Sequence, residues 1–172
     1  FVNITNPGVQ GSNAWNWFRH IGETTIPAAL AAGDFFAFTV VPAAGGFYVT
    51  SVVFAAQARE NVQTFSFGLF TSADSFASQL GPTVTFTSPE AVAYFTSFKL
   101  SITFDQPVSE PTEFRLAVAR AGAQNLYAPI GITDFDQSPG VNGFEVHGYV
   151  PEPAGVALAG LGVAAALRRR AI

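Results

Sequence analysis

The chain lacks cysteine and methionine and has a single lysine, Lys99. Without cysteine it forms no disulfide, thiol nucleophile or thiolate metal site. Charged residues make up only 12% of the 172 residues, about half the usual share. Disorder is not indicated, because a disordered chain combines few aromatics with many charges, and aromatics are 14% of this one, with 18 phenylalanines. We therefore expect one folded domain with a substantial apolar core.

Charge is distributed unevenly along the chain. Residues 1–153 carry a net charge of −7, whereas residues 154–172 contain three arginines and no acid, a net charge of +3. The acidic body argues against a nucleic-acid partner, since nucleic acid requires a basic face. A basic end after an apolar run is typical of the cytoplasmic face of a membrane.

Apolar and polar residues alternate with period two in several segments, which is the pattern of half-buried strands. In the clearest segment, residues 98–105, four apolar side chains alternate with Lys99, Ser101, Thr103 and Asp105. Glycine and proline punctuate these segments. We expect strands near residues 1–6, 14–22, 34–41, 46–57, 62–71, 83–87, 92–105, 113–120, 126–135 and 142–150. Their close spacing predicts a sandwich or a barrel, with a helical turn or an ordered loop over residues 73–80.

The composition changes after Val150. Pro151 and Pro153 flank Glu152 and prevent regular strand pairing. Residues 154–167 then contain only Ala, Gly, Val and Leu. As a helix this run would be about 21 Å long, short of the hydrocarbon core of about 30 Å. Length alone therefore favours a buried or interfacial helix.

The tail as a whole resembles the PEP-CTERM sorting signal. Three elements in order carry the resemblance: the Pro-Glu-Pro tripeptide, the apolar run and an arginine cluster. The sorting residues would be Pro151, Glu152, Pro153, Arg168, Arg169 and Arg170. The resemblance implies an exported bacterial protein, anchored transiently in the inner membrane by its tail. It also implies that the membrane enzyme exosortase removes the tail, and that the protein reaches the cell surface or the exopolysaccharide matrix.

The body is similar to domains that often precede such tails, which are jelly-roll-like sandwiches. The similarity lies in the Gly-Gly-Phe-Tyr-Val segment at 45–49, the Phe-Ser-Phe strand at 65–67 and the last strand, which leads directly into Pro-Glu-Pro. We therefore expect an all-β fold: a single jelly-roll-like antiparallel β-sandwich over residues 1–150. A sorting tail with a short C-terminal apolar helix would follow over residues 151–172.

Groups suited to catalysis are sparse. The only histidines are His20 and His147, and surface or rim positions are the simpler interpretation for both. No Gly-x-Ser-x-Gly elbow, phosphate loop or His-Glu-x-x-His motif occurs. A hydrolytic triad needs a nucleophile, a base and an orienting group within reach of one another. We expect a non-enzyme with no cofactor.

Two sets of residues suggest ligands. Asp134 and Asp136 more simply shape a loop, but their carboxylates would also suit structural calcium. Trp15 and Trp17 would lie on one side of a strand. There they would either pack in the core or stack on a sugar ring.

The sequence leaves two functions open. In the first, the protein is a structural component of the surface or extracellular matrix that associates with copies of itself into oligomers or filaments. Low charge leaves its edge strands poorly protected against pairing, and a strand containing Phe1, Val2 and Ile4 would complete a neighbour's sheet by β-augmentation. In the second, it is a carbohydrate-binding module associated with exopolysaccharide.

Overall fold

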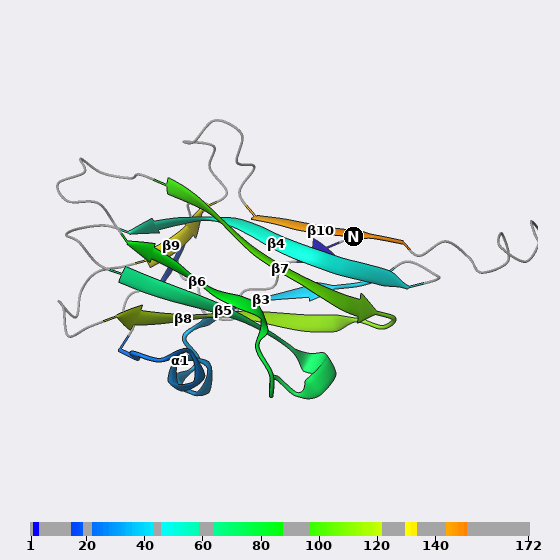
Figure 1. Cartoon of the computed structure of the whole chain (residues 1–172), viewed down its shortest axis with the longest axis horizontal. Helices are drawn as coiled ribbons and strands as arrows, with labels where there is room; N and C mark the ends of the chain where they lie inside the picture. Colours follow the sequence, from blue (N-terminus) through cyan, green and yellow to red (C-terminus); the bar gives the residue numbers. More distant parts are fainter. Residues whose placement is uncertain are drawn as a thin grey trace, which may run out of the picture.

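The computed structural model of the chain describes residues 2–3, 15–18, 22–42, 46–58, 64–87, 97–121, 130–133 and 144–150. Ten strands, one α-helix and one 3-10 helix lie in these ranges (Figure 1). In chain order they are β1 (Val2–Asn3), β2 (Trp15–Phe18), α1 (Ile26–Ala32), β3 (Phe35–Val40), β4 (Phe47–Ala58), β5 (Thr64–Thr71), η1 (Ser72–Asp74), β6 (Leu80–Thr87), β7 (Ser97–Val108), β8 (Thr112–Ala121), β9 (Ile130–Thr133) and β10 (Phe144–Tyr149).

The strands form two antiparallel sheets, one above the other in Figure 1. Sheet A has the order β1-β3-β8-β5-β6. In sheet B, β4 pairs with β7 along nearly its whole length. Its opposite edge is divided between β10, which pairs with residues 48–54, and β9, which pairs with residues 55–58 and also with β2.

The pairing is nested along the chain. β5 pairs with β6, β4 with β7, β3 with β8 and β2 with β9, all antiparallel. The chain thus forms one long hairpin whose turn lies between β5 and β6. Further pairing of β5 with β8 and of β4 with β9 joins these nested pairs into two sheets. β1 and β10 are added at the edges of β3 and β4.

An aromatic core fills the space between the sheets. The largest fully buried side chains are phenylalanines, one or two from each of several strands: Phe38, Phe54, Phe65, Phe67 and Phe114. The rings of Phe38 and Phe114 stack with centroids 5.2 Å apart, and Phe144 meets Phe38 edge-on at 4.8 Å. Such contacts add to the stabilisation that comes from burying the rings. The apolar members of the alternating segments therefore face inward.

A second, smaller core lies on the outer face of sheet A, where α1 covers β5 and β8 (Figure 1). Ile26 and Ala29 of the helix pack against Phe70, Ala117 and Ala119. The Thr25 hydroxyl caps the helix by accepting from the Ala28 N–H, at 3.3 Å. At the other end Gly33 adopts φ +88°, a conformation for which glycine is the default residue.

The structure confirms an all-β, sandwich-like fold of antiparallel sheets, with strands in all ten predicted places. It adds α1, which the alternation did not predict, and it resolves residues 73–80 into the end of η1 and a turn leading into β6. The predicted tail helix, like all of residues 151–172, lies outside the described ranges. Within those ranges, no helix has the length and apolarity needed to cross a membrane.

Candidate functional site

The outer face of sheet B carries a cluster of polar and aromatic side chains near the start of β4. We call it the tyrosine face. Its members come from β4, β7 and β10: Tyr48, Ser51, Thr103, Asp105, Glu145, His147 and Tyr149. They alternate with the core-facing residues of the same strands, so they point away from the core. The only described α-helix, α1, lies on the other side of the sandwich.

Two irregularities of the sheet coincide at this face. The register of β4 with β7 shifts between Val49 and Ser51. The register of β4 with β10 shifts at the same place, because His147 pairs with Ser51 whereas Gly148 pairs with Val49. Both shifts fall at Thr50. β-Bulges re-aim side chains and are over-represented next to functional sites, so the coincidence marks this part of the sheet.

Tyr48 and Tyr149 are direct cross-strand partners at one end of the face. Their rings are nearly parallel, with an interplanar angle of 8° and centroids 5.1 Å apart. Tyr149 is 49% exposed. A large aromatic side chain left half in solvent is well suited to contact a ligand, because its ring offers an apolar surface and its hydroxyl a hydrogen bond.

Polar groups line the face beside these rings. The register places Thr103, Ser51 and His147 in one row across three strands. The His147 Nε2 atom lies 2.8 Å from a carboxylate oxygen of Glu145, and 52% of the histidine side chain is exposed. His147 thus occupies a surface position, as predicted.

Ser51, His147 and Glu145 are residue types that also form hydrolytic triads. A triad requires the nucleophile to be hydrogen-bonded to the base. The structure describes both Ser51 and His147 and shows no hydrogen bond between them. The imidazole instead pairs with Glu145.

Asp105 adds a negative charge close to the rings. The pKa of the Tyr149 hydroxyl is raised above its ordinary value of 10.0, first by desolvation and then by the charge of Asp105 and by Tyr48. Like any tyrosine hydroxyl, that of Tyr149 is protonated at neutral pH and is able to donate a hydrogen bond.

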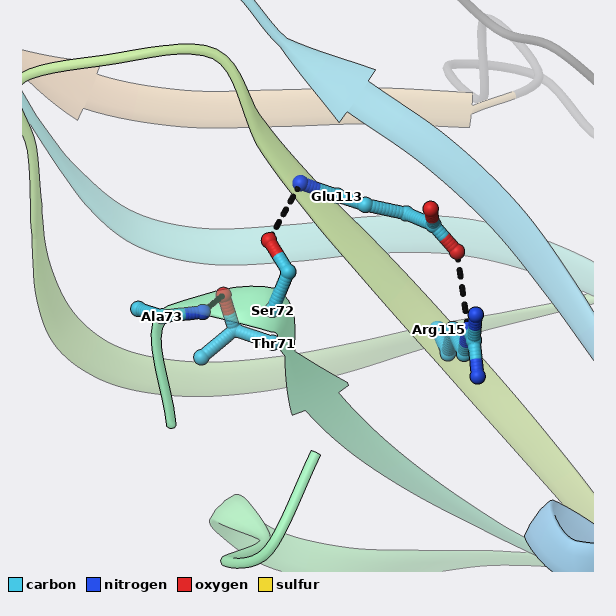
Figure 2. Close-up of polar contacts among 5 residues, drawn as sticks. All are labelled: Thr71, Ser72, Ala73, Glu113 and Arg115. Carbon is cyan, nitrogen blue, oxygen red and sulfur yellow. Dashed lines mark hydrogen bonds and ion pairs between the residues drawn. The ribbon is translucent and has the colours of Figure 1, made fainter. Parts of the chain in front are cut away.

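The other prominent polar cluster is on the outer face of sheet A, around Arg115 of β8 (Figure 2). The Arg115 Nε donates to Glu113 at 2.7 Å. Its guanidinium carbon lies 3.7 Å from the centroid of the Phe76 ring and 4.6 Å from that of Phe35. Cation–π contacts of this kind hold side chains in place.

The same cluster fixes η1 to β8. The Ser72 hydroxyl accepts from the Glu113 N–H at 3.0 Å, and the Thr71 hydroxyl accepts from the Ala73 N–H at 3.4 Å (Figure 2). After η1 the chain passes through two residues with positive φ, Ser75 at +60° and Phe76 at +61°. Such a conformation is uncommon outside glycine. Because these groups are engaged with one another, we interpret the cluster as structural.

The structure places some of the predicted site residues. Trp15 and Trp17 lie on β2, where they pair with Thr133 and Gly131 of β9. Val2 lies on β1 within its own chain's sheet A. Phe1, Ile4, His20, Asp134 and Asp136, together with the six predicted sorting residues, lie outside the described ranges.

The sequence did not single out the tyrosine face as a site. The alternation of residues 144–150 is enough to put Glu145, His147 and Tyr149 on the polar side of the last strand. The pairing of Tyr149 with Tyr48, however, depends on the register between strands that are far apart in the sequence. Among the described residues, no group of three or more His, Cys, Asp or Glu side chains is arranged to hold a metal ion.

No protein-family model matches this chain. No curated protein matches its sequence either.

Proposed function

We propose that this chain is a non-catalytic, exported structural protein of the bacterial surface or extracellular matrix that assembles with copies of itself. Export is inferred from the resemblance of residues 151–172 to the PEP-CTERM signal. In this proposal the tail anchors the protein transiently in the inner membrane, and exosortase is its processing partner. The non-catalytic role agrees with the small set of titratable groups in the sequence, which includes two histidines and no cysteine.

The body is proposed to be a jelly roll. In that architecture a long antiparallel hairpin is wrapped into two facing sheets. The nested pairs of strands, from β5·β6 outward to β2·β9, support this assignment. So do the strand orders β3-β8-β5-β6 and β2-β9-β4-β7, which are what wrapping such a hairpin produces. β1 and β10 are then additions to an eight-stranded framework.

The attachment of β1 is the observation that carries the assembly proposal. β1 joins sheet A at the outer edge of β3 through two residue pairs, Val2 with Val40 and Asn3 with Thr39. Within the described residues this contact is short, and an edge strand held by a short contact is available for exchange. We propose that the first strand of one copy replaces β1 of the next copy on the β3 edge.

Exchange of this kind has a simple structural basis. The edge of β3 already accepts a strand with the sequence of residues 2–3 in an antiparallel register. The incoming strand would be identical, so the new pairing would be the same as the old one. Because the donor and acceptor edges of one copy differ, successive exchanges link copies head to tail. Such contacts extend into filaments unless they close into rings.

A shortened chain tests the proposal. Removing residues 1–6 takes away the donor strand and leaves the β3 edge open. We expect the full chain to form larger species as its concentration rises in light scattering, and the shortened chain to remain monomeric. The shortened chain should also bind a synthetic peptide with the sequence of residues 1–6 and should shorten the assemblies when mixed with the full chain.

A matched peptide provides the control. A peptide in which proline replaces Val2, Asn3 and Ile4 loses the N–H groups of all three residues. It cannot donate to β3 whichever of these residues face that edge, so it should not bind. Two results together would refute strand exchange: the full chain stays monomeric over a wide concentration range, and the shortened chain does not bind the native peptide.

A further inference from the structure

We infer that the tyrosine face is a binding site for an uncharged polysaccharide chain. The inference is independent of strand exchange, because the face lies on β4, β7 and β10 whereas exchange involves β1 and β3. It also uses different aromatic residues from Trp15 and Trp17. It rests on the stacked tyrosines, on the polar groups beside them and on the charge of the face.

The tyrosine pair supplies an apolar platform. Sugar rings present faces rich in C–H groups, and these faces pack against aromatic rings. Tyr48 and Tyr149 hold each other in position, with rings 5.1 Å apart at an angle of 8°. A platform that is already ordered loses little conformational entropy when a ligand binds. The 49% exposure of Tyr149 leaves ring surface available for that contact.

The neighbouring side chains match the hydroxyl groups of a sugar. A sugar hydroxyl both donates and accepts hydrogen bonds, so its site needs groups of both kinds. Asp105 and Glu145 carry acceptors, whereas the Ser51 and Thr103 hydroxyls do both. Tyr149 and Glu145 are four residues apart on β10, which at the rise of a strand is a span of about 13 Å. The face thus has room for a short stretch of sugar chain with the rings of the tyrosines at one end.

The negative charge of the tyrosine face disfavours other classes of ligand. Two carboxylates, Asp105 and Glu145, lie on the face, and residues 1–153 have a net charge of −7. Nucleic acids, anionic polysaccharides and anionic lipid surfaces would be repelled. The core of a protein–protein interface is depleted in charged residues. The hydroxyl and charged groups beside the tyrosine rings therefore fit a protein partner poorly. A neutral ligand with many hydroxyls fits both the charge and the chemistry.

Calorimetric titration of the full chain tests the inference. The probes are soluble hexaoses of β-1,4-linked glucose, β-1,3-linked glucose and β-1,4-linked mannose, at a protein concentration where light scattering shows monomers. We expect at least one hexaose to bind. Tyr149→Ala should weaken that binding about tenfold, which corresponds to about 1.4 kcal/mol. Tyr149→Phe should keep most of the affinity, because the ring remains.

Matched charge variants separate a local contact from a general effect. Asp105→Asn should weaken binding, because it removes an acceptor next to the rings. Glu110→Gln removes one exposed negative charge outside the face and should leave the affinity unchanged. In the unaltered chain, the ring protons of Tyr48 and Tyr149 should shift in NMR spectra when the hexaose is added, a readout that needs no variant to fold.

Several results would overturn the inference. These are no binding of any of the three hexaoses, equal binding by Tyr149→Ala and the unaltered chain, or tyrosine ring signals that do not respond to a bound hexaose. Tighter binding of an anionic hexauronate than of every neutral hexaose would overturn it as well. Strand exchange would be untouched by all of these results, since it is measured by the mass of the assemblies.

Discussion

The outer faces of the two sheets are built from different residues. On sheet A, α1 lies over a patch made of small residues and Phe70. Ala117 at the centre of the patch is fully buried. At Gly68 an added Cβ would lie only 2.6 Å from the Ile26 Cγ2 atom and 2.7 Å from the Gln79 Oε1 atom. A larger side chain at either position would push the helix away from the sheet.

On sheet B the outward positions of β7 and β10 carry longer polar and aromatic side chains, including Glu145, His147 and Tyr149, and no described helix covers them. On β4, which lies between these two strands, the outward residues Val53 and Ala55 are small and buried. Comparison of the two outer faces shows that the size of an outward-facing residue, as well as its polarity, indicates whether it is covered. Small apolar residues that face outward are buried on both sheets. Long polar ones mark the face that meets solvent or a ligand.

The largest expected effect comes from placing a charge on each face in turn. Ala117→Asp would bury a carboxylate beneath α1 without a partner. An uncompensated buried charge costs about 3–5 kcal/mol, so we expect the free energy of unfolding, measured by denaturant titration, to fall by about that amount. Displacement of α1 would limit the loss, and limited proteolysis within residues 22–34 would detect it.

Ser101→Asp is the matched change on sheet B. Ser101 is exposed on β7, and exposed substitutions usually change stability by less than about 0.5 kcal/mol. Equal losses in the two variants would show that the faces do not differ as described. The same would follow if Ala117→Asp left both the stability and the protease resistance unchanged.

The sequence predicted the strands well because their pattern is local. In β7 the apolar residues Leu100, Ile102 and Phe104 alternate with polar ones, and these apolar side chains do pack on the core. Alternation of this kind is set by the period-two geometry of a strand, so it can be read without knowing what each strand pairs with.

The helix and the tyrosine face were missed for different reasons. α1 has only seven residues, too few for helical periodicity to stand out, although Thr25 and Pro27 are a residue pair favoured at helix starts. The tyrosine face depends on partners about a hundred residues apart. Its geometry also depends on register shifts at Thr50, and no local pattern specifies either feature.

A smaller loss of stability is expected at Arg115, whose contacts hold η1 and the following turn on the outer face of sheet A. Arg115→Ala removes the ion pair with Glu113 and the contacts with the Phe35 and Phe76 rings. Because the site is partly exposed, we expect a loss of about 1–2 kcal/mol. This corresponds to a fall in Tm of about 2–8 °C for a domain of this size.

Arg115→Lys distinguishes the contributions within this cluster. Lysine keeps the charge but lacks the planar group that stacks on two rings, so it should restore only part of the lost Tm. Full restoration by lysine would mean that charge alone holds the turn. An unchanged Tm in Arg115→Ala would mean that the cluster does not stabilise the covered face at all.

The smallest expected effect is a pH dependence of stability that arises at Asp34, on the face of sheet A that α1 covers. Asp34 follows Gly33, the C-cap residue of α1, and its main chain forms hydrogen bonds with the helix and with β8. Desolvation, and secondarily the charge of Glu23, raise the pKa of its carboxyl above the ordinary value of 3.8. The folded protein therefore holds this proton more tightly than the unfolded chain does. As pH rises from about 3.8 through the raised pKa, stability falls, and the penalty is complete above that pKa.

Asp34→Asn should remove this part of the pH dependence. We expect the variant to have the same stability as the unaltered chain at acid pH and to be slightly more stable at neutral pH. The gain should be smaller than the loss expected for Arg115→Ala. Glu23→Gln should give an intermediate curve, because it removes the second cause and leaves desolvation. Melting temperatures measured across pH 3 to 8 would check both variants. If Asp34→Asn instead lowered stability at neutral pH, the ionised carboxylate would be making a favourable contact. Desolvation of Asp34 would then not destabilise the folded protein.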